Sequence, residues 1–412
     1  MAGPYRIGVA GFGIAGGTAS YLLARDGHVV TLFERSPTIG PVGAGILLQP
    51  SGQVVLKRLG VLDDAIRDAE PVHGLLAYTH RGRILTRLSY SAISPGCQAY
   101  GVHRGSLFDV INKAVRSTEA TVVLDCEIVD RRIHSDGLFA IERDGREYGP
   151  FDFLVAADGS KSALRAASGI RQRVHTYPYG AIWGVGDCSA VRGYLFQVVE
   201  GTAKLIGLLP IGKGQCTLFV SARPGEWAHI SAGGFGEWSD DVLRLCPKAE
   251  EVFVSISGAD QLRFTDYRHA WMQSWHDDRI VFLGDAAHAM SPHLGQGVNL
   301  ALMDAESLAS ALSVAPDYPT AFRIHEETRR RHIGFYSRLT FILSPFFQSG
   351  SSVLGLGRDS CLPMMARIPW VRRRMVNAMA GISNGIWRPA MDISGLQADS
   401  KLTHVPAGRL YI

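Results

Sequence analysis

The first 35 residues constrain the fold of this chain more than any other stretch. An apolar run at Ile7–Ala10 leads into the turn GFGIAG at positions 11–16, and apolar residues at helical spacing follow. A second apolar run, Val29–Phe33, ends at Glu34. A strand, a glycine turn, a helix and a second strand that ends at an acid form the βαβ unit that holds a dinucleotide. We therefore predict a dinucleotide site here.

Each glycine of this turn has its own role in such a site. Gly11 permits the tight turn, Gly13 lets the backbone approach the pyrophosphate, and Gly16 lets the helix pack closely on the strand. The free N–H groups at the start of the helix face the phosphates. Glu34 can accept hydrogen bonds from ribose hydroxyls and would repel a 2′-phosphate. At this point NAD and FAD both remain open.

Composition indicates a well-buried globular enzyme. The 412 residues are 46% hydrophobic and 19% charged, which excludes disorder and allows two or three packed units. The net charge is +4, and no basic run precedes the arginines at 329–331, which fall in a helical, solvent-facing pattern. We therefore expect no nucleic-acid partner.

Cysteine spacing and the N-terminus favour a cytoplasmic protein. The six cysteines are scattered, with no CxxC pair and no metal-like spacing, and are typical of buried thiols in a reducing compartment. We expect no metal site. The first strand begins within seven residues, which leaves no room for a signal peptide. No apolar run reaches the roughly 18 residues that a membrane span requires.

Patterns along the rest of the chain predict an α/β fold in three parts. Apolar runs at Phe153–Ala156 and Arg279–Leu283 read as further buried strands of the parallel sheet. Short alternating strands around a single helix, Trp238–Leu245, predict a mostly antiparallel sheet. The expected parts are a Rossmann-like nucleotide domain at 1–72, 99–171 and 267–330, an inserted substrate-binding β-sheet lobe at 73–98 and 172–266, and a C-terminal helical region at 331–412.

Two later motifs indicate a cofactor longer than NAD. The stretch LVAADGSKSALR begins at Leu154, and RIVFLGDAAHAMSPHLGQGVNLALMDA begins at Arg279. An NAD site needs one glycine-rich crevice, whereas the ribityl chain and ring of FAD need a second cradle. Asp285, just beyond a buried strand, is placed to accept hydrogen bonds from ribityl hydroxyls. The N–H groups where a helix begins at Gly297 suit the pyrimidine edge of a flavin.

With the N-terminal turn, these motifs resemble the single-component FAD-dependent aromatic hydroxylases, the p-hydroxybenzoate hydroxylase-like class A flavoprotein monooxygenases. The resemblance covers about the first 330 residues in order and spacing. It implies bound FAD, transient NADH or NADPH, and O₂ as co-substrate. The implied reaction is hydroxylation of an aromatic or phenolic small molecule through a flavin C4a-hydroperoxide. The alternative is the same cofactor chemistry giving epoxidation or Baeyer–Villiger oxidation of a polyketide or terpenoid.

The resemblance also assigns residues to the FAD site. It places Arg104 near the phosphates and adenine, Ile128 at the adenine, and Asp158-Gly159 in a double role with FAD and the nicotinamide nucleotide. The full set expected at FAD is Gly11, Gly13, Ile14, Ala15, Gly16, Glu34, Arg35, Gly45, Arg104, Ile128, Asp158, Gly159, Gly284, Asp285, Pro292, Gly295, Gln296, Gly297, Val298 and Asn299.

Residues for chemistry and substrate are less defined. Pro292 and His293 are candidate catalytic residues beside the flavin ring. The candidate substrate contacts on a lobe strand are Tyr194, Phe196 and Gln197. His288 is open to a structural or a catalytic role, and Arg165 fits a surface helix residue. The apolar C-terminal helices are expected to pack on the first domain; a homodimer interface or, with the arginines at 372–374, a membrane surface are the alternatives.

Overall fold

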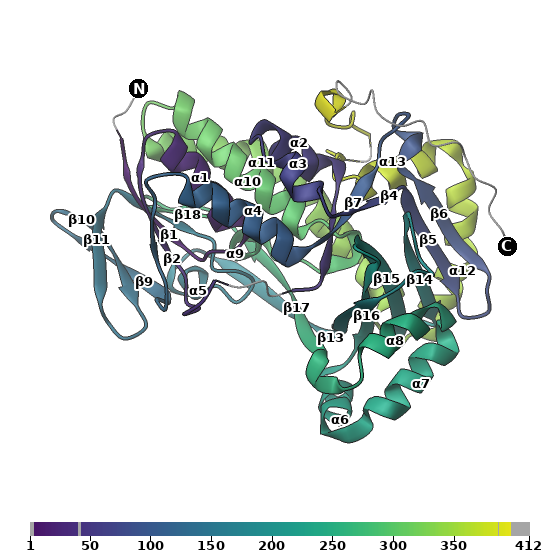
Figure 1. The fold of residues 1–412 in the computed structure, drawn as a ribbon. Coiled ribbons are helices and arrows are strands. Elements are labelled where there is room, and N and C mark those ends of the chain that lie inside the picture. The colour runs from purple at the N-terminus through teal and green to yellow at the C-terminus, as the bar shows by residue number, and fades with distance from the viewer. Residues whose placement is uncertain (1–3, 40–42, 386, 397–412) are drawn as a thin grey trace.

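The computed structural model describes residues 4–39, 43–385 and 387–396, and its centre is a parallel sheet. The five strands lie in the order β18-β12-β1-β2-β8 (Figure 1). They are β1 at Arg6–Ala10, β2 at Val29–Phe33, β8 at Thr121–Val123, β12 at Phe153–Ala156 and β18 at Ile280–Phe282. The register pairs Val9 with Leu32 on one side and with Val155 on the other. The strands predicted near 153 and 279 therefore extend the sheet that the N-terminal unit begins.

Both faces of this sheet are buried, because successive side chains point into two different hydrophobic clusters. Phe153 and Val155 lie in the cluster shared with helices α1, α2, α4 and α10. Leu154 and Ala156 lie in the cluster shared with a small antiparallel sheet and with helix α11. The helices are α1 at Ile14–Arg25, α2 at Pro50–Arg58, α4 at Arg104–Arg116, α10 at Gly297–Val314 and α11 at Tyr318–Phe347, and the small sheet is β9 at Ile128–His134, β10 at Gly137–Glu142 and β11 at Glu147–Phe151.

A second large sheet forms the lobe. Seven strands lie in the order β17-β13-β16-β15-β14-β5-β6, and all neighbours are antiparallel except β14 and β5. They are β5 at Gly74–Thr79, β6 at Ile84–Ser89, β13 at Gln172–Asp187, β14 at Tyr194–Glu200, β15 at Lys204–Gly212, β16 at Gln215–Ala222 and β17 at Arg263–Met272. The hairpin near residues 74–88 thus pairs, through β5, with β14, which lies more than 100 residues later in the sequence.

Short elements connect the two sheets and cover them. A three-stranded sheet of β3, β7 and β4 lies between them, and three helices cover one face of the lobe. These elements are β3 at Gly45–Leu48, β4 at Glu70–Val72, β7 at Ala99–His103, α3 at Leu62–Ile66, α5 at Ala163–Ala167, α6 at Pro224–His229, α7 at Phe235–Leu245, α8 at Glu250–Ser255 and α9 at Asp285–His288.

Helices dominate the chain after the last strand. Asp317 caps α11 by accepting a 2.8 Å hydrogen bond from the Thr320 N–H. The chain continues through α12 at Ser352–Arg367 and α13 at Pro369–Met379, which lie along the outer edge of the lobe beside β6 (Figure 1). Within the described residues no single helix is long and apolar enough to cross a membrane, although α11 and α12, bent by 113°, meet that criterion together.

The α/β class, the Rossmann-like sheet, the mostly antiparallel lobe sheet and the C-terminal helices are confirmed. Three other details of the sequence interpretation, one on the lobe helices and two on the exposure of single side chains, are wrong. Helices α6 and α8 accompany the one helix that we predicted in the lobe, because they cover the apolar face of a wide sheet. Arg329 is 4% exposed rather than solvent-facing, because a buried carboxylate pairs with it. Cys361 is exposed, although Cys126, Cys188, Cys216 and Cys246 are buried as expected.

Candidate functional site

A cavity of about 480 Å³ opens where β1, β2 and β12 end. Ligands of open α/β sheets bind at the carboxyl ends of the strands, and this volume lies within the usual range for small-molecule sites. The predicted site residues that line the cavity are Gly11, Gly13, Ile14, Glu34, Arg35, Arg104, Ile128, Asp158 and Gly159. Segments of sequence more than 120 residues apart therefore meet at one site, as predicted for the adenosine diphosphate half of a dinucleotide.

The three glycines of the N-terminal turn face different surroundings. Gly11 has φ of +100°, and a Cβ there would lie 2.5 Å from the carbonyl oxygen of Ala157. A Cβ on Gly16 would lie 2.0 Å from the carbonyl oxygen of Gly11. A Cβ on Gly13 would meet no protein atom within 4 Å. Packing thus explains two of the glycines, whereas the space beside Gly13 fits a bound group.

Helix α1 begins at this open space. Gly13 is its N-cap and supplies no capping side chain, so the first N–H groups of the helix have no side-chain acceptor there. Their partial positive charge suits a pyrophosphate. Ala15, the other predicted member of this turn, is buried beneath the helix start.

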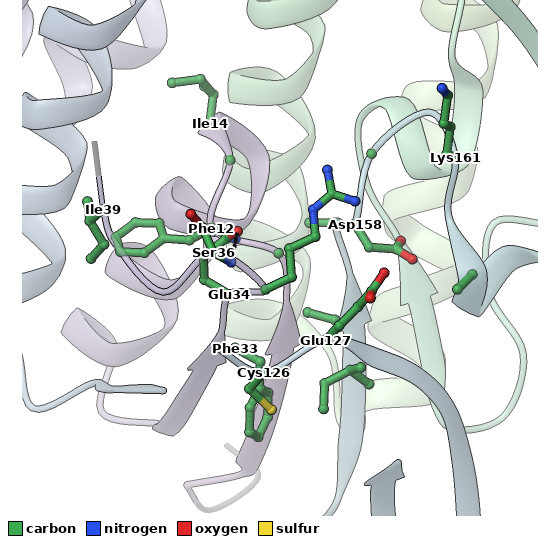
Figure 2. A pocket seen from close by; sticks show the side chains of 18 of the residues that line it. Phe12, Ile14, Phe33, Glu34, Ser36, Ile39, Cys126, Glu127, Asp158 and Lys161 are labelled. Atoms are coloured by element: carbon green, nitrogen blue, oxygen red, sulfur yellow. Dashed lines mark hydrogen bonds between the residues drawn. The ribbon is translucent and has the colours of Figure 1, made fainter. Parts of the chain in front are cut away.

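Glu34 holds the glycine turn in place from the end of β2. Its Oε2 accepts a 2.8 Å hydrogen bond from the Phe12 N–H, and its Oε1 accepts one of 2.9 Å from the Ser36 N–H. Each carboxylate oxygen retains a lone pair for a ribose hydroxyl. Figure 2 shows the Glu34 side chain beside the cavity with Phe12 and Ser36. The bracing of the turn is a role that the sequence motif did not indicate.

Asp158 approaches the same cavity from the end of β12 (Figure 2). Its Oδ2 accepts a 3.3 Å hydrogen bond from the Leu164 N–H, whereas its buried Oδ1 has no partner among the described residues. Burial raises the pKa of the Asp158 carboxyl. A buried acceptor without a donor is costly, so this oxygen fits a hydroxyl or N–H of a bound dinucleotide. The residues present therefore fit FAD.

Several cavity residues were not predicted from the sequence. The charged ones are Glu127, Arg143 and Lys161. Lys161 forms an ion pair of 3.1 Å with Asp266 of β17, and so links the loop after β12 to the lobe. It lies within the motif that begins at Leu154, which was the available signal. Glu127 directly precedes β9 and Arg143 directly follows β10 of the small sheet, which no motif marked.

The loop after β18 packs against the first glycine turn. A Cβ on Gly284 would lie 3.2 Å from the Cβ of Ala15, at the start of α1. Gly284, Asp285, Pro292 and the segment 295–299 do not line the cavity of about 480 Å³. Gly284 lies next to the cavity through its contact with Ala15, because β18 neighbours β12 in the sheet.

Arg165 joins the two cofactor loops and is buried at 3% exposure. Its guanidinium donates to the carbonyl oxygens of Ser160 at 2.8 Å, Asp285 at 3.2 Å and Ala286 at 2.8 Å. The interpretation as a surface helix residue is therefore wrong. Ser162, whose side chain accepts a hydrogen bond from the Arg165 N–H, caps the short helix that positions it.

A buried charge cluster supports the loop after β18 from behind. Oδ2 of Asp304 accepts hydrogen bonds from the Gly284 N–H at 3.0 Å and from His288 Nε2 at 2.6 Å. Its Oδ1 accepts from Arg329 Nε at 2.8 Å. Burial raises the pKa of Asp304, but His288 and Arg329 outweigh it and hold the pKa well below its usual range. Since His288 bonds to Asp304, it has a structural role here.

His293 lies in a short helical turn with Pro292. Its Nδ1 is 3.0 Å from Ser291 Oγ, and its ring lies 5.9 Å from that of Phe347. The Nε2 atom is buried and has no partner among the described residues. Burial lowers the pKa of His293 to about 4, so the imidazole is neutral near pH 7.

Other predicted residues around this loop already bond to protein. The Asn299 side chain donates to the Leu47 and Gly295 carbonyl oxygens and accepts from the Gln49 N–H. Gln296 Nε2 donates to the Met379 carbonyl oxygen, while Val298 packs against the core. The Gly45 N–H donates to Thr217 Oγ1 at 2.7 Å and thus ties β3 to the lobe.

The candidate substrate residues on β14 point to opposite faces of the lobe sheet, because side chains alternate along a strand. Phe196 packs in the cluster beneath α7 and α8. Tyr194, two residues away, is on the same face. Gln197 lies on the other face, with Val199, which belongs to the cluster that contains Phe347. Only Gln197 is therefore on the side of His293.

Comparisons with known proteins agree with this geometry. Residues 5–316 match the protein-family model described as FAD binding domain. The chain belongs to this family. It is an FAD-dependent monooxygenase, and NAD(P)H and O₂ are the usual co-substrates of the class.

Two curated relatives are similar over most of the chain. The aurachin C monooxygenase/isomerase of Stigmatella aurantiaca is 32% identical over 333 residues, which cover 78% of this chain and 84% of that protein. The 3-amino-4-hydroxybenzoate 2-monooxygenase of Streptomyces cremeus is 28% identical over 351 residues, which cover 79% and 83%. The tetrameric form of 2-methyl-3-hydroxypyridine-5-carboxylic acid oxygenase shares the fold, with a TM-score of 0.73, 23% identity and coverage of 87% and 96%.

Proposed function

We propose that this monooxygenase hydroxylates the ring of an aromatic or phenolic small molecule, with FAD extending from the cavity to the loops after β18. The observation that carries the cofactor site is that the cavity is lined both by Gly13, beside which there is open space, and by Asp158, whose Oδ1 has no partner among the described residues. The substrate named for the Streptomyces relative is an aminohydroxybenzoate, a phenol. Ring hydroxylation is therefore favoured over epoxidation or Baeyer–Villiger oxidation.

Bound FAD would supply the redox chemistry, and the residues of the chain would bind and orient it. In this proposal the N–H groups at the start of α1 bind the pyrophosphate, and Glu34 and Asp158 accept hydrogen bonds from hydroxyl groups. Asp285 would accept hydrogen bonds from the ribityl chain. The N–H groups at the start of α10, at Gly297, would bind the pyrimidine edge of the ring, and the helix dipole would stabilise negative charge there.

The substrate would lie between His293 and the inner face of the lobe sheet. Residues that are paired across neighbouring strands lie on the same face of a sheet. The register pairs Gln197 with Gly207, Gly207 with Phe219, and Phe219 with Trp183, so these four residues share the inner face. A Cβ on Gly207 would lie 1.9 Å from the Phe219 ring, so the ring lies over this glycine. Phe219 and Trp183 are half-buried. They offer a flat apolar surface for an aromatic ring, with the Gln197 amide at its end.

His293 is proposed to hold the phenolic oxygen. Its Nδ1 faces Ser291 Oγ, and its Nε2 is buried without a partner, so one ring nitrogen remains for a substrate hydroxyl. A neutral imidazole can accept a hydrogen bond from the phenolic hydroxyl, which orients the substrate and makes its ring more electron-rich. Pro292 limits the freedom of this turn because its ring fixes φ.

Flavin reduction tests the activity directly. Anaerobic addition of NADH or NADPH should bleach the yellow holoprotein, faster with a bound substrate, and O₂ should then yield a hydroxylated product. The better reductant also assigns the nicotinamide cofactor. A flavin that neither nucleotide bleaches, with or without a panel of phenols and N-heterocycles, would rule the proposal out.

His293→Gln tests the substrate assignment separately. If His293 orients the phenol, this variant oxidises NAD(P)H but diverts oxygen to H₂O₂, because a misplaced ring does not capture it. Phe196→Leu, on the covered face of the lobe, is the matched control and should retain coupled product formation. Equal coupling in wild type and His293→Gln would contradict the role of His293.

We also propose the three-part division of the chain given by the sequence, a homodimeric assembly and a cytoplasmic location. The lobe sheet and the parallel sheet have separate hydrophobic clusters, which supports the division. Sedimentation equilibrium of the holoprotein measures the assembly, and fractionation of cells measures the location.

A further inference from the structure

Helix α12 is apolar on its solvent side. Nine of the fifteen exposed large hydrophobic side chains in the described part of the chain lie between residues 341 and 387. The only buried residues of α12 are Gly355 and Arg358, whereas Val353, Leu356 and Met364 are 76%, 71% and 66% exposed. At about 100° per residue these three side chains share one stripe of the helix. A soluble helix normally shows the opposite arrangement.

The stripe continues into the next helix. Ile368, directly after α12, and Trp370, in the first turn of α13, are 52% and 46% exposed. We call Val353, Leu356, Met364, Ile368 and Trp370 the apolar patch. The helices α12 and α13, which carry it, lie along the outer edge of the lobe, away from the parallel sheet (Figure 1).

Positive charge surrounds this patch. Between residues 341 and 391 the sequence has six arginines and one aspartate, a net charge of +5 that exceeds the +4 of the whole chain. The one aspartate, Asp359, pairs with the buried Arg358. Arg367, Arg372 and Arg373 are exposed beside the apolar patch. The rest of the chain is close to neutral, so the charge is concentrated where the apolar surface is.

The adjoining edge of the lobe adds more cations. Helices α12 and α13 pack against β6, the edge strand of the seven-stranded sheet. The exposed side chains of this hairpin include Arg83, Ile84 and Arg87. No acidic residue occurs between positions 71 and 108. The hairpin therefore repeats the combination of arginine and exposed aliphatic surface found on α12.

The charge around the apolar patch indicates which partner covers it, a second copy of the chain or an anionic lipid surface. A two-fold dimer joins the same patch of both subunits, which would bring two sets of arginines together. An anionic bilayer accepts both features at once, because the apolar side chains enter the acyl boundary and the arginines remain with the phosphate groups. Trp370 suits the same interface, where tryptophan is enriched.

We infer that the apolar patch and its arginines dock the protein on an anionic phospholipid bilayer. The docked helices adjoin the proposed substrate site, since Leu362 of α12 packs in the cluster of Phe347, whose ring contacts that of His293. A lipophilic substrate dissolved in the bilayer would thus meet the protein beside the proposed substrate site. The docking itself does not depend on the proposed reaction.

Vesicle flotation of the flavin-loaded protein tests the inference. We expect binding to phosphatidylcholine vesicles that contain about a third phosphatidylglycerol, weaker binding at high salt, and little binding to phosphatidylcholine alone. Leu356→Ser combined with Met364→Ser should weaken binding at least about tenfold. Val254→Ser is the control for the apolar change, because Val254 is 82% exposed on α8, away from the patch.

A charge-reversal pair isolates the electrostatic part. Arg372→Glu with Arg373→Glu should lower binding to anionic vesicles at least about tenfold. Lys113→Glu with Arg116→Glu, on α4, changes net charge equally and should have a much smaller effect. Flavin content and the unfolding midpoint of each variant verify that it is folded. If both charge pairs weaken binding equally, non-specific attraction suffices and the inference fails.

Other occupants of the patch give different results. A wild-type dimer that Leu356→Ser with Met364→Ser converts to monomer, with no vesicle binding, would assign the patch to a second copy. Vesicle binding that appears only when the chain is ended at Leu396 would assign it to the C-terminal residues. Either result would overturn the inference, whereas equal vesicle binding by the full and shortened chains supports it.

Discussion

Gly13→Ala and Gly16→Ala should impair different properties of the protein, FAD binding in the first variant and folding stability in the second, although both glycines belong to the same motif. The added Cβ at Gly13 meets no protein atom within 4 Å, and its φ of −88° and ψ of −170° suit any residue. Relative to glycine, alanine lowers the entropy of the unfolded chain but is a poorer N-cap. These effects oppose each other, so the stability of the apoprotein should change by less than about 1 kcal/mol.

FAD binding should respond strongly to Gly13→Ala. The methyl group would occupy the space proposed for the pyrophosphate and remove at least one charge-assisted hydrogen bond. Such a bond contributes about 1.5–3 kcal/mol, which raises the Kd for FAD about 10- to 150-fold. Titration of apoprotein with FAD, followed by flavin fluorescence, measures this change.

Gly16→Ala is the matched comparison, because its Cβ would lie 2.0 Å from the Gly11 carbonyl oxygen. The helix and strand must separate, which should lower the free energy of unfolding of the apoprotein by about 1–3 kcal/mol. Urea unfolding followed by tryptophan fluorescence measures this loss. Wild-type FAD affinity in Gly13→Ala, or a larger loss of apoprotein stability in Gly13→Ala than in Gly16→Ala, would refute the reasoning.

Three further predictions concern the cofactor loops and the buried histidines. Arg165→Met should release FAD and should lower the free energy of unfolding by about 1–3 kcal/mol for each buried carbonyl left without a donor. Arg116→Met, on the surface of α4, is the control and should have neither effect. The absorbance of bound flavin measures FAD release, and urea unfolding measures the stability. Asp285→Ala should purify with little flavin, and full retention of flavin would contradict a role at the ribityl chain. Burial lowers the pKa of His269 and of His325 to about 4, from 6.5 in the unfolded chain. Between pH 6.5 and pH 4 the unfolded chain therefore binds a proton at each histidine that the folded protein does not bind. As pH falls through this window, each histidine lowers the free energy of unfolding by about 1.4 kcal/mol per pH unit. His325→Gln should reduce the slope of unfolding free energy against pH in that window, and an unchanged slope would contradict the assignment.

The sequence alone determined the fold class and the identity of the cofactor. The turn at 11–16, Glu34 and the strand pattern around them are local features, and period and glycine placement suffice to identify them. The later motifs at Asp158 and Asp285 narrowed the predicted cofactor from an unspecified dinucleotide to FAD, because their order and spacing match one family.

Only the tertiary structure decided how individual side chains are used. In the sequence, Arg165 and Arg329 resemble surface arginines. In the structure both are buried, because Arg165 donates hydrogen bonds to the carbonyl oxygens of Ser160 and Asp285 and Arg329 donates to Asp304. These acceptors are distant in sequence or lie within turns, so the sequence does not reveal them. Alternation along β14 predicts which of its side chains share a face of the sheet. It does not predict which face the lobe helices cover, and this decides which side chains can face a substrate. Local patterns specify elements and motifs, whereas burial and pairing arise from long-range packing that one sequence does not display.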